Sequence, residues 1–558
     1  MLRSTRGVAL ITLVMLNVFT LAAGVAVARM LPPRLARLKP LQVASRPDVH
    51  ASPVLATTGS GSPLPTSAGL SGALSGLLAN HALGSGVAAV VADASGNVLY
   101  SQNADAMSAP ASTEKIATAV AALDVLGPGA RFSTRVVSGS GGGIVLVGGG
   151  DPTLAAGSPP AADYPQPATL ADLAAKTARA LKARHRDTVT LDYDDSLFTG
   201  PGMAPGWPQS YVTTGDVTPI SSLEVDQGRL TPAGLPEDAD DPDNYRPRST
   251  DPASVAVTAF RGYLSSDGIT VTGTPSSVTA PSRAAVLGSV SSPPLSAIVE
   301  WMLLESNNVI AENLARQVAI VKGQPASFAG AAAAETSVLE KLGSGTAIHL
   351  VDGSGLSPQD RIAPQVLIRL LTMAASAQHP GLRAAITGLP VAGFAGTLSV
   401  GQSVFGAIGG AARGVVRAKT GNLDTVAALA GFAYDQDGRL LIFALNAAKV
   451  PKAADLQTAA NTIDDAAAAI AACGCRLPRG ATLCWPGRRP PNPPQRPRGG
   501  TSPAHRLAVA RARWPATAAT RSVEESLGSG RALVRGTRPG LIQHRGHTLA
   551  AHNVRWEL

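Results

Sequence analysis

Ser112 and Lys115 are the first residues in this 558-residue chain whose types and spacing could do chemistry. Pro110 precedes them and an apolar periodicity follows, so we expect a helix that starts near Ser112 and places both side chains on one face. A serine hydroxyl beside a lysine amine can act as a nucleophile with its general base. Taken alone, the spacing favours the ordinary interpretation, an exposed serine and a solvated lysine on an amphipathic helix.

Two further short motifs follow in a fixed order, Ser306-Asn307-Asn308 and Lys419-Thr420-Gly421. The first is expected in a loop between two helices, and the second on a strand that a hairpin follows. S-x-x-K, S-x-N and K-T-G in this order are the motif set of penicillin-binding proteins and β-lactamases. The joint occurrence in suitable local structure favours the catalytic interpretation that no single motif supports.

The elements that must position these motifs come from both ends of the chain. Residues 86–92 and 98–100 predict one β-hairpin, and residues 427–434 and 440–446 predict another beside the strand at 415–421. An Ala-rich helix over 453–472 follows. We therefore expect an α+β fold, one antiparallel sheet packed between helices, with a mixed α/β insertion of one or two domains.

The predicted organisation divides the chain into five parts. They are a signal or membrane anchor at 1–30, a Pro/Ser-rich linker at 31–66, a penicillin-binding catalytic domain at 67–137 and 291–475, inserted domain(s) at 138–290, and a disordered basic extension at 476–558.

The N-terminal segment combines Arg3 and Arg6 with an apolar run over residues 8–28. This run is long for a signal-peptide core and suits one membrane span, although Ala26-Val27-Ala28 resembles a small-x-small cleavage site. The sequence therefore predicts an extracytoplasmic protein of the cell envelope, either membrane-anchored or secreted. Membrane contact through this segment depends on whether it is cleaved.

The charge of the chain is unevenly distributed. Residues 476–558 contain 15 of the 47 basic residues, all Arg, and three of the 38 acidic residues, so the rest holds 32 basic and 35 acidic residues. This mildly acidic body argues against a nucleic-acid partner. The tail, which lacks Lys and apolar periodicity, is expected to be disordered. An out-of-frame reading of GC-rich coding sequence or a wall-binding tail are the alternatives.

Metal and cofactor chemistry find no sequence support. All three cysteines fall at 473 or later, and the nine histidines show no H-E-x-x-H or comparable ligand spacing. We expect no metal and no organic cofactor.

Over residues 70–475 the chain resembles the serine D-alanyl-D-alanine carboxypeptidases, specifically the low-molecular-mass penicillin-binding proteins with a large insertion. Besides the three motifs, the sequences GDPTL at 150–154 and DGSGLS at 352–357 are similar to motifs of that group. The spacing of 191 residues between Lys115 and Ser306 leaves room for the insertion, which class A β-lactamases lack.

The resemblance implies a function, and residue chemistry is consistent with it. Ser112 is expected to attack the D-Ala–D-Ala bond of peptidoglycan stem peptides and form an acyl-enzyme. β-Lactams are expected to inhibit the enzyme by acylating the same serine. Lys115 is the expected base, with its pKa lowered by Lys419 and partial burial. Ser306 is expected to relay the proton to the leaving amine.

Five further residues are expected to bind substrate. Asn308 would bond the peptide group, Thr420 would join Lys419 at the terminal carboxylate, and Gly421 would let substrate lie along the strand edge. The backbone N–H groups of Ser112 and Asn422 would hold the oxyanion. Asp151 is a candidate to bind the third residue of the stem peptide; the alternative is a carboxylate that only stabilises the turn before Pro152.

Two positions depart from the family pattern. Asn422 stands where Ser or Thr is usual, which keeps the backbone donor and removes a hydroxyl. Pro358 stands where many relatives carry an Arg that helps to bind a diamino acid, and Arg361 is near but not aligned. The rival hypotheses are a β-lactamase and a non-catalytic cell-wall-binding protein. Whether carboxypeptidase or endopeptidase action dominates is left open.

Overall fold

The computed structural model describes residues 62–157, 164–230, 246–399, 412–451 and 455–474. The predicted anchor at 1–30, residues 31–61 of the predicted linker and the predicted extension at 476–558 lie outside the described residues. Within the described ranges, no helix has both the length and the apolar character needed to span a membrane.

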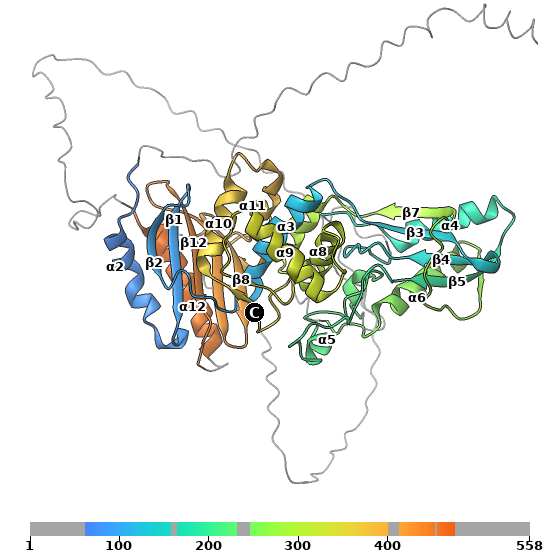
Figure 1. Cartoon of the computed structure of the whole chain (residues 1–558), viewed down its shortest axis with the longest axis horizontal. Coiled ribbons are helices and arrows are strands. Elements are labelled where there is room, and N and C mark those ends of the chain that lie inside the picture. The colour runs from blue at the N-terminus through green and yellow to red at the C-terminus, as the bar shows by residue number, and fades with distance from the viewer. Residues whose placement is uncertain (1–61, 158–163, 231–245, 400–411, 452–454, 475–558) are drawn as a thin grey trace, which may run out of the picture. The chain divides into compact units, whose positions relative to one another are not determined.

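The first sheet joins strands from the two ends of the chain (Figure 1). Its order is β10-β11-β12-β1-β2, and every pair of neighbours is antiparallel. The bounds are β1 Val87–Asp93, β2 Val98–Gln102, β10 Val416–Leu423, β11 Val426–Tyr434 and β12 Leu440–Ala447. The register runs from Val87 opposite Ala447 to Asp93 opposite Leu441. The predicted α+β fold, with one antiparallel sheet built from both chain ends, is confirmed.

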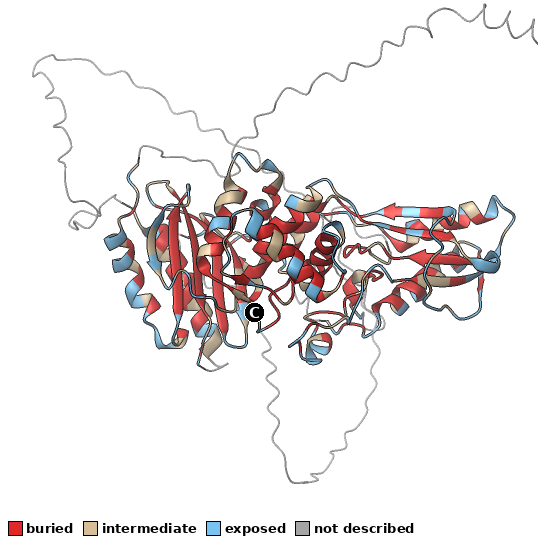
Figure 2. Cartoon of the chain, viewed as in Figure 1, coloured by how far each residue is buried: buried red, intermediate tan, exposed pale blue. Residues whose placement is uncertain are grey.

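Both faces of this sheet are covered, which explains why its central strands are apolar at successive positions (Figure 2). Alternate residues enter different cores, because side chains of a strand point to opposite faces. In β1, Val90 and Ala92 pack into one hydrophobic cluster, whereas Val87, Ala89 and Val91 pack into the other.

Helices from both halves of the chain form the two covering layers. On one face lie α2 (Ser67–Leu78) and α12 (Leu456–Ala472). The other face carries the larger layer, which consists of α3 (Lys115–Leu126), α7 (Leu295–Leu304), α8 (Asn308–Val321), α9 (Phe328–Lys341), α10 (Pro364–Ala375) and α11 (Ala384–Thr387). The ladder β8 (Ile348–His349) and β9 (Arg361–Ile362) lies between α9 and α10 in sequence. Of the three motifs, the first lies at the start of α3, the second between α7 and α8, and the third within β10.

The middle of the chain forms a second, mixed sheet with its own core. The order is β6-β5-β4-β3-β7, with β4 Ile144–Val147, β5 Thr188–Asp194 and β6 Thr270–Thr272 paired in parallel. The antiparallel neighbours are β3 Ser133–Ser138 and β7 Val286–Ser291. Helices α4 (Leu170–Lys182) and α6 (Pro252–Ser266) pack on this sheet, and the short α5 (Ser210–Thr214) belongs to the loops that follow β5.

One strand lies in a different sheet from the one the sequence suggested. The predicted boundary at 137/138 groups residues 133–137 with the catalytic segments, but β3 pairs with β4 and β7 on its two sides. Its residues would suit either sheet by their alternating pattern, so only the pairing decides. We therefore propose that the insertion spans β3 to β7, residues 133–291.

Candidate active site

The nucleophile candidate sits at the entrance to α3. Residues Ala111–Glu114 form a 3₁₀ turn and the α-helix begins at Lys115, so Ser112 lies just before the expected helix. Thr113 closes the turn because its hydroxyl donates to the Pro110 carbonyl at 2.7 Å. Ala111 has a φ of +46°, a left-handed conformation that L-residues adopt at a cost. The turn therefore holds Ser112 half-buried in a sharply defined position.

Lys115 points its amine at this serine. Its Nζ lies 2.9 Å from Ser112 Oγ, and the same amine donates to Asn308 Oδ1 and to the Ser354 carbonyl, each at 2.7 Å. The side chain is fully buried. Burial lowers the pKa of Lys115 from 10.5 to about 8, against the opposing effect of nearby carboxylates, of which Asp352 is the strongest. An amine with this pKa can take a proton near neutrality.

The second and third motifs meet in the same way. Lys419 Nζ on β10 donates to Ser306 Oγ at 2.8 Å, although the two residues are 113 positions apart. Ser306 lies between α7 and α8 with a φ of +57°. Burial, and then the positive charge of Lys115, hold the pKa of Lys419 well below its usual 10.5, while Glu305 acts in the opposite direction. The site thus contains two serine–lysine pairs close enough to influence each other.

Asn308 connects the first pair to the insertion. Its Oδ1 accepts from Lys115, and its Nδ2 donates to the backbone carbonyl of Asp216 at 2.9 Å. The preceding Asn307 caps α8, because its Oδ1 accepts from the Ile310 N–H at 3.0 Å. The substrate contact of Asn308 stays a prediction; the structure shows a hydrogen bond from Lys115 to its Oδ1, which the sequence did not indicate.

The remaining K-T-G residues lie on an edge strand. Within the described ranges, residues 419–423 of β10 pair only with β11, so their other edge faces the site. Thr420 exchanges a hydroxyl hydrogen bond with Thr397 at 2.8 Å, a contact that the sequence did not indicate. Asn422 is exposed.

Gly421 approaches the nucleophile turn rather than an open edge. A Cβ at this position would lie 2.9 Å from the Pro110 carbonyl oxygen and 3.2 Å from the Thr113 nitrogen. Glycine therefore lets β10 pack directly against the turn that holds Ser112.

A cleft of about 850 Å³ opens over these residues. Its lining includes five of the predicted residues, Ser112, Ser306, Asn308, Thr420 and Asn422. Lys115 and Lys419 lie fully buried behind the serines that they contact. The insertion adds Tyr164, Asp216 and Arg248 to the lining, and α12 adds Asp464.

Asp151 is not brought to this cleft. Its Oδ1 accepts from both the backbone N–H and the hydroxyl of Thr153, at 2.9 and 2.6 Å, and the side chain is buried. Burial raises the pKa of Asp151 to about 6. The geometry agrees with the turn-stabilising alternative and gives the substrate-binding prediction no support.

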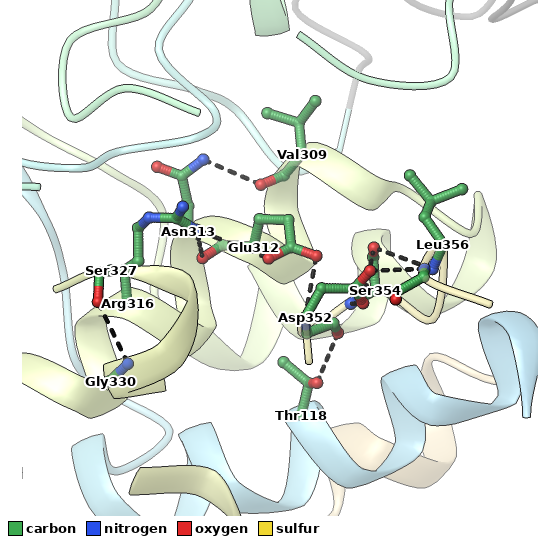
Figure 3. Close-up of polar contacts among 12 residues, drawn as sticks. Thr118, Val309, Glu312, Asn313, Arg316, Ser327, Gly330, Asp352, Ser354 and Leu356 are labelled. Carbon is green, nitrogen blue, oxygen red and sulfur yellow. Dashed lines mark hydrogen bonds and ion pairs between the residues drawn. The ribbon is translucent and has the colours of Figure 1, made fainter. Parts of the chain in front are cut away.

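The DGSGLS segment at 352–357 supports Lys115, because the Ser354 carbonyl accepts a hydrogen bond from its amine. Figure 3 shows Asp352 and Ser354 of this segment, with Thr118 of α3 and Glu312 of α8 near them. Asp352 Oδ1 accepts from the backbone N–H groups of Ser354 and Gly355, and its Oδ2 accepts from Ser357 N and Trp207 Nε1, at 2.7 to 2.9 Å. This folded loop presents the Ser354 carbonyl to the amine. Sequence similarity identified the segment, but its spacing did not reveal that role.

Arg361, the nearest arginine to the departure at Pro358, is engaged locally. Its Nη1 donates to the carbonyls of Pro358 and Asp360, both at 2.7 Å.

Three buried carboxylates below the nucleophile turn are the only described group with close metal-ligating atoms. Glu114, Asp352 and Asp360 offer oxygens within 4.8 Å of one another. However, backbone N–H groups already donate to carboxylate oxygens of Asp352 and Asp360. These contacts fit carboxylates that bind donors or a proton better than ligands of a cation. Both Glu114 oxygens are buried without a hydrogen-bond partner. A shared proton explains this arrangement because it removes a buried charge.

Comparison with known proteins identifies the family of this chain. The profile of the D-Ala-D-Ala carboxypeptidase 3 (S13) family matches residues 70–245 and 233–470. The chain belongs to this family. The predicted family and enzyme class, a D-alanyl-D-alanine carboxypeptidase, are thereby confirmed, and the β-lactamase and non-catalytic alternatives are not favoured.

Relatives within the family match over most of their length. Carboxypeptidase DacB of Mycolicibacterium smegmatis is 36% identical over 434 residues, which cover 77% of this chain and 89% of the relative. A D-alanyl-D-alanine carboxypeptidase of Actinomadura is 30% identical over 435 residues, 64% of this chain and 76% of the relative.

A solved structure shares the fold. Penicillin binding protein 4 (dacB) from Haemophilus influenzae matches with a TM-score of 0.57 and 23% identity, and the match covers 71% of this chain and 98% of that structure.

Proposed function

We propose that this chain hydrolyses the D-Ala–D-Ala bond of peptidoglycan stem peptides with Ser112 as the nucleophile. The observation that carries the proposal is the 2.9 Å contact between Ser112 Oγ and the fully buried Lys115 amine at the wall of an open cleft. A serine whose proton has a nearby acceptor can form a covalent acyl-enzyme.

Acylation begins with a proton transfer. Ser112 Oγ bonds to the carbonyl carbon of the penultimate D-Ala while its proton moves to neutral Lys115. The backbone N–H groups of Ser112 and Asn422 would stabilise the oxyanion, by about 3–4 kcal/mol for each well-placed donor. When the tetrahedral intermediate collapses, the C–N bond breaks and the terminal D-Ala leaves as its amine.

The second serine–lysine pair completes the step. Ser306 Oγ, which accepts from Lys419 at 2.8 Å, is placed to pass a proton to the leaving amine. Lys419 and Thr420 would bind the terminal carboxylate, whose negative charge favours the ammonium form of Lys419. Because like charges disfavour each other, a charged Lys419 then favours the neutral form of Lys115, which is the form that can accept the Ser112 proton. Carboxylate binding and base activation would thus be coupled.

Water completes the cycle by attacking the acyl carbonyl, which releases the shortened peptide and restores Ser112. Substrate would add along the free edge of β10 in the manner of an extra strand. The same residues can cleave a D-Ala bond to a cross-linked peptide, so endopeptidase action is a second outcome of this site.

An enzyme that acts on peptidoglycan must reach its substrate outside the cytoplasm. We propose that residues 1–30 direct export, with membrane anchoring if this segment is retained.

The decisive experiment is labelling with a fluorescent penicillin. We expect one label per molecule, slowly reversed and absent in Ser112→Ala, together with D-Ala release from a pentapeptide. Comparison with cross-linked dimers measures the endopeptidase share. Correctly folded wild-type protein that takes no label would refute the proposal, and fast steady-state nitrocefin turnover would indicate a β-lactamase instead.

A further inference from the structure

The insertion reaches the S-x-N motif through two neighbouring asparagines. Asn307 Nδ2 donates to the side-chain Oε1 of Gln227 at 2.6 Å, and Asn308 Nδ2 donates to the backbone carbonyl of Asp216 at 2.9 Å. Asn307 and Gln227 are buried, so little water competes with their contact. Two loops of the insertion therefore bracket the start of α8.

The Asp216 contact fixes which way the Asn308 amide faces. With Nδ2 on a carbonyl, Oδ1 is left to accept from the Lys115 amine at 2.7 Å. A flipped amide would place two donors against the ammonium and an oxygen against a carbonyl, so the alternative orientation is disfavoured at both ends. The position of the Asp216 carbonyl thus controls a hydrogen bond to the proposed base.

Arg248 connects the two bracketing loops. Its Nε donates to the Gly215 carbonyl and its Nη1 to the Gln227 carbonyl, each at 3.0 Å. The Arg248 backbone N–H also donates to the Val212 carbonyl at 2.8 Å, and only 6% of the residue is exposed. One planar guanidinium therefore sets the separation of the loop at 215–216 from Gln227.

The loop around Gln227 needs such support. Asp226 and Gln227 both have left-handed backbones, with φ of +51° and +56°, a costly conformation for residues other than glycine. Nearby, Glu224 accepts from Asn313 Nδ2 of α8 at 3.0 Å, and the charge of Arg248 acts to lower the raised pKa of this buried carboxyl, whose main cause is desolvation. Arg248 thus also compensates the polar contact that docks the insertion on α8.

We propose that Arg248 is a positioning residue for acylation, acting through the Gly215 and Gln227 carbonyls on Asn307 and Asn308 and so on the amine of Lys115. This inference rests on the proposed roles of Ser112 and Lys115. It gives the insertion a role in catalysis, since both asparagines of the second motif also donate hydrogen bonds to the insertion.

The test compares three variants of the full chain by the rate of acylation with fluorescent penicillin, by kcat and KM for D-Ala release, and by Tm. Arg248→Gln is expected to lower the acylation rate and kcat by about 10- to 100-fold, with little change in KM, because misplaced reacting groups slow the chemical step. Arg248→Lys keeps the charge without the planar guanidinium, so its acylation rate should lie between those of wild type and Arg248→Gln.

Arg261→Gln is the matched control. Arg261 also donates to two backbone carbonyls of the insertion, those of Val271 and Gly273, but it is absent from the cleft lining. We expect its acylation rate to stay within about twofold of wild type. If Arg248→Gln does not fold, Arg248→Lys with a near-normal Tm carries the test.

A double-mutant cycle separates positioning from direct substrate binding, because Arg248 also lines the cleft. Residues that act through one another are not additive. In an Asn308→Ala background, Arg248→Gln should therefore cost several-fold less than in wild type. The inference is overturned by equal losses in both backgrounds, by a change confined to KM, or by Arg248→Lys and Arg248→Gln that acylate like wild type. Absence of label in wild type would instead refute the proposed function.

Discussion

Two buried lysines lie behind the wall of one cleft, and each contacts a different serine. Nζ of Lys115 lies 2.9 Å from Ser112 Oγ, and Nζ of Lys419 lies 2.8 Å from Ser306 Oγ. Both amines are fully buried, which disfavours their charged forms. In the proposed mechanism neutral Lys115 serves as the base. Lys419 takes its charged form when it binds the substrate carboxylate.

The pH dependence of acylation tests the base. Burial lowers the pKa of Lys115 to about 8, and only the neutral amine accepts the Ser112 proton. The rate of penicillin acylation should therefore rise with pH and reach half its plateau near pH 8, measured by stopped-flow or quenched labelling between pH 5.5 and 9.5. A rate that is flat or falls across this range would contradict a lysine base.

Glu114 provides a residue-scale test of the buried carboxylates. Burial, then the charges of Asp360 and Asp352, raise the pKa of Glu114 well above its usual 4.5. The other ionisable groups facing it are Lys115 on its own segment, Glu312 on α8 and Glu335 on α9. A raised carboxyl pKa means that the folded protein holds a proton that the unfolded chain has released. This contribution to stability is present below about pH 4.5 and is lost as pH rises.

Glu114→Gln keeps the neutral form at every pH. Its free energy of unfolding should match wild type near pH 4.5 and then exceed it by a margin that grows by about 1.4 kcal/mol per pH unit. Urea denaturation at pH 5, 6, 7 and 8 measures this difference, with the exposed Glu340→Gln as control. A difference that does not grow with pH would show that Glu114 is ionised in the fold.

At the scale of elements, the decisive contact is that between β10 and the nucleophile turn. Lys419 contacts Ser306 and Thr420 lines the cleft on a strand that approaches the backbone of Pro110 and Thr113, an approach that Gly421 permits. A strand and a 3₁₀ turn from opposite ends of the chain are thereby held in one fixed relation.

Gly421→Ala should separate these elements. The added Cβ would meet the Pro110 carbonyl at 2.9 Å, so backbone must move. We expect penicillin acylation to fall at least about tenfold, with a loss of stability of about 1–3 kcal/mol. Gly262→Ala is the control, because a Cβ in that α6 position meets nothing within 4 Å and should stabilise the helix by about 0.5–1 kcal/mol. Equal acylation by the two variants would show that this contact does not matter.

At the scale of the whole molecule, α12 is the last element of the described part of the chain. This helix ends at Ala472 and packs on the sheet face opposite the α3 layer. The sequence beyond it carries 15 Arg, no Lys and no apolar periodicity, so we propose that residues 476–558 are dispensable for the fold.

A chain that ends after residue 475 should keep the wild-type Tm and acylation rate. The physical reason is that described residues before 475 already form hydrophobic cores on α2, α12 and both sheets. Thermal unfolding and penicillin labelling of the two chains, together with limited proteolysis of the longer one, make the comparison. Protease-resistant residues past 485, or a lower Tm after truncation, would contradict the proposal.

The sequence alone predicted much of this protein, because local pattern and motif identity survive without a structure. Apolar runs on either side of polar turns predicted the two hairpins, and the order of three motifs predicted that Ser112, Lys115, Ser306 and Lys419 belong to one site, although not that Lys419 contacts Ser306. Helix or strand character depends on neighbours in sequence, which are always visible. A family motif indicates the chemistry of a site through the types and order of its residues.

Tertiary structure decided what depends on contacts between distant segments. The strand at 133–138 fits either sheet by pattern, and only pairing with β4 and β7 assigns it. The contact of Gly421 with the nucleophile turn was not predicted, and Asp151 bonds its own loop. Arg248 lies 60 residues before Asn308, and no local pattern links them. Hydrogen bonds across such separations depend on where the folded backbone places each carbonyl, which the order of residues does not specify.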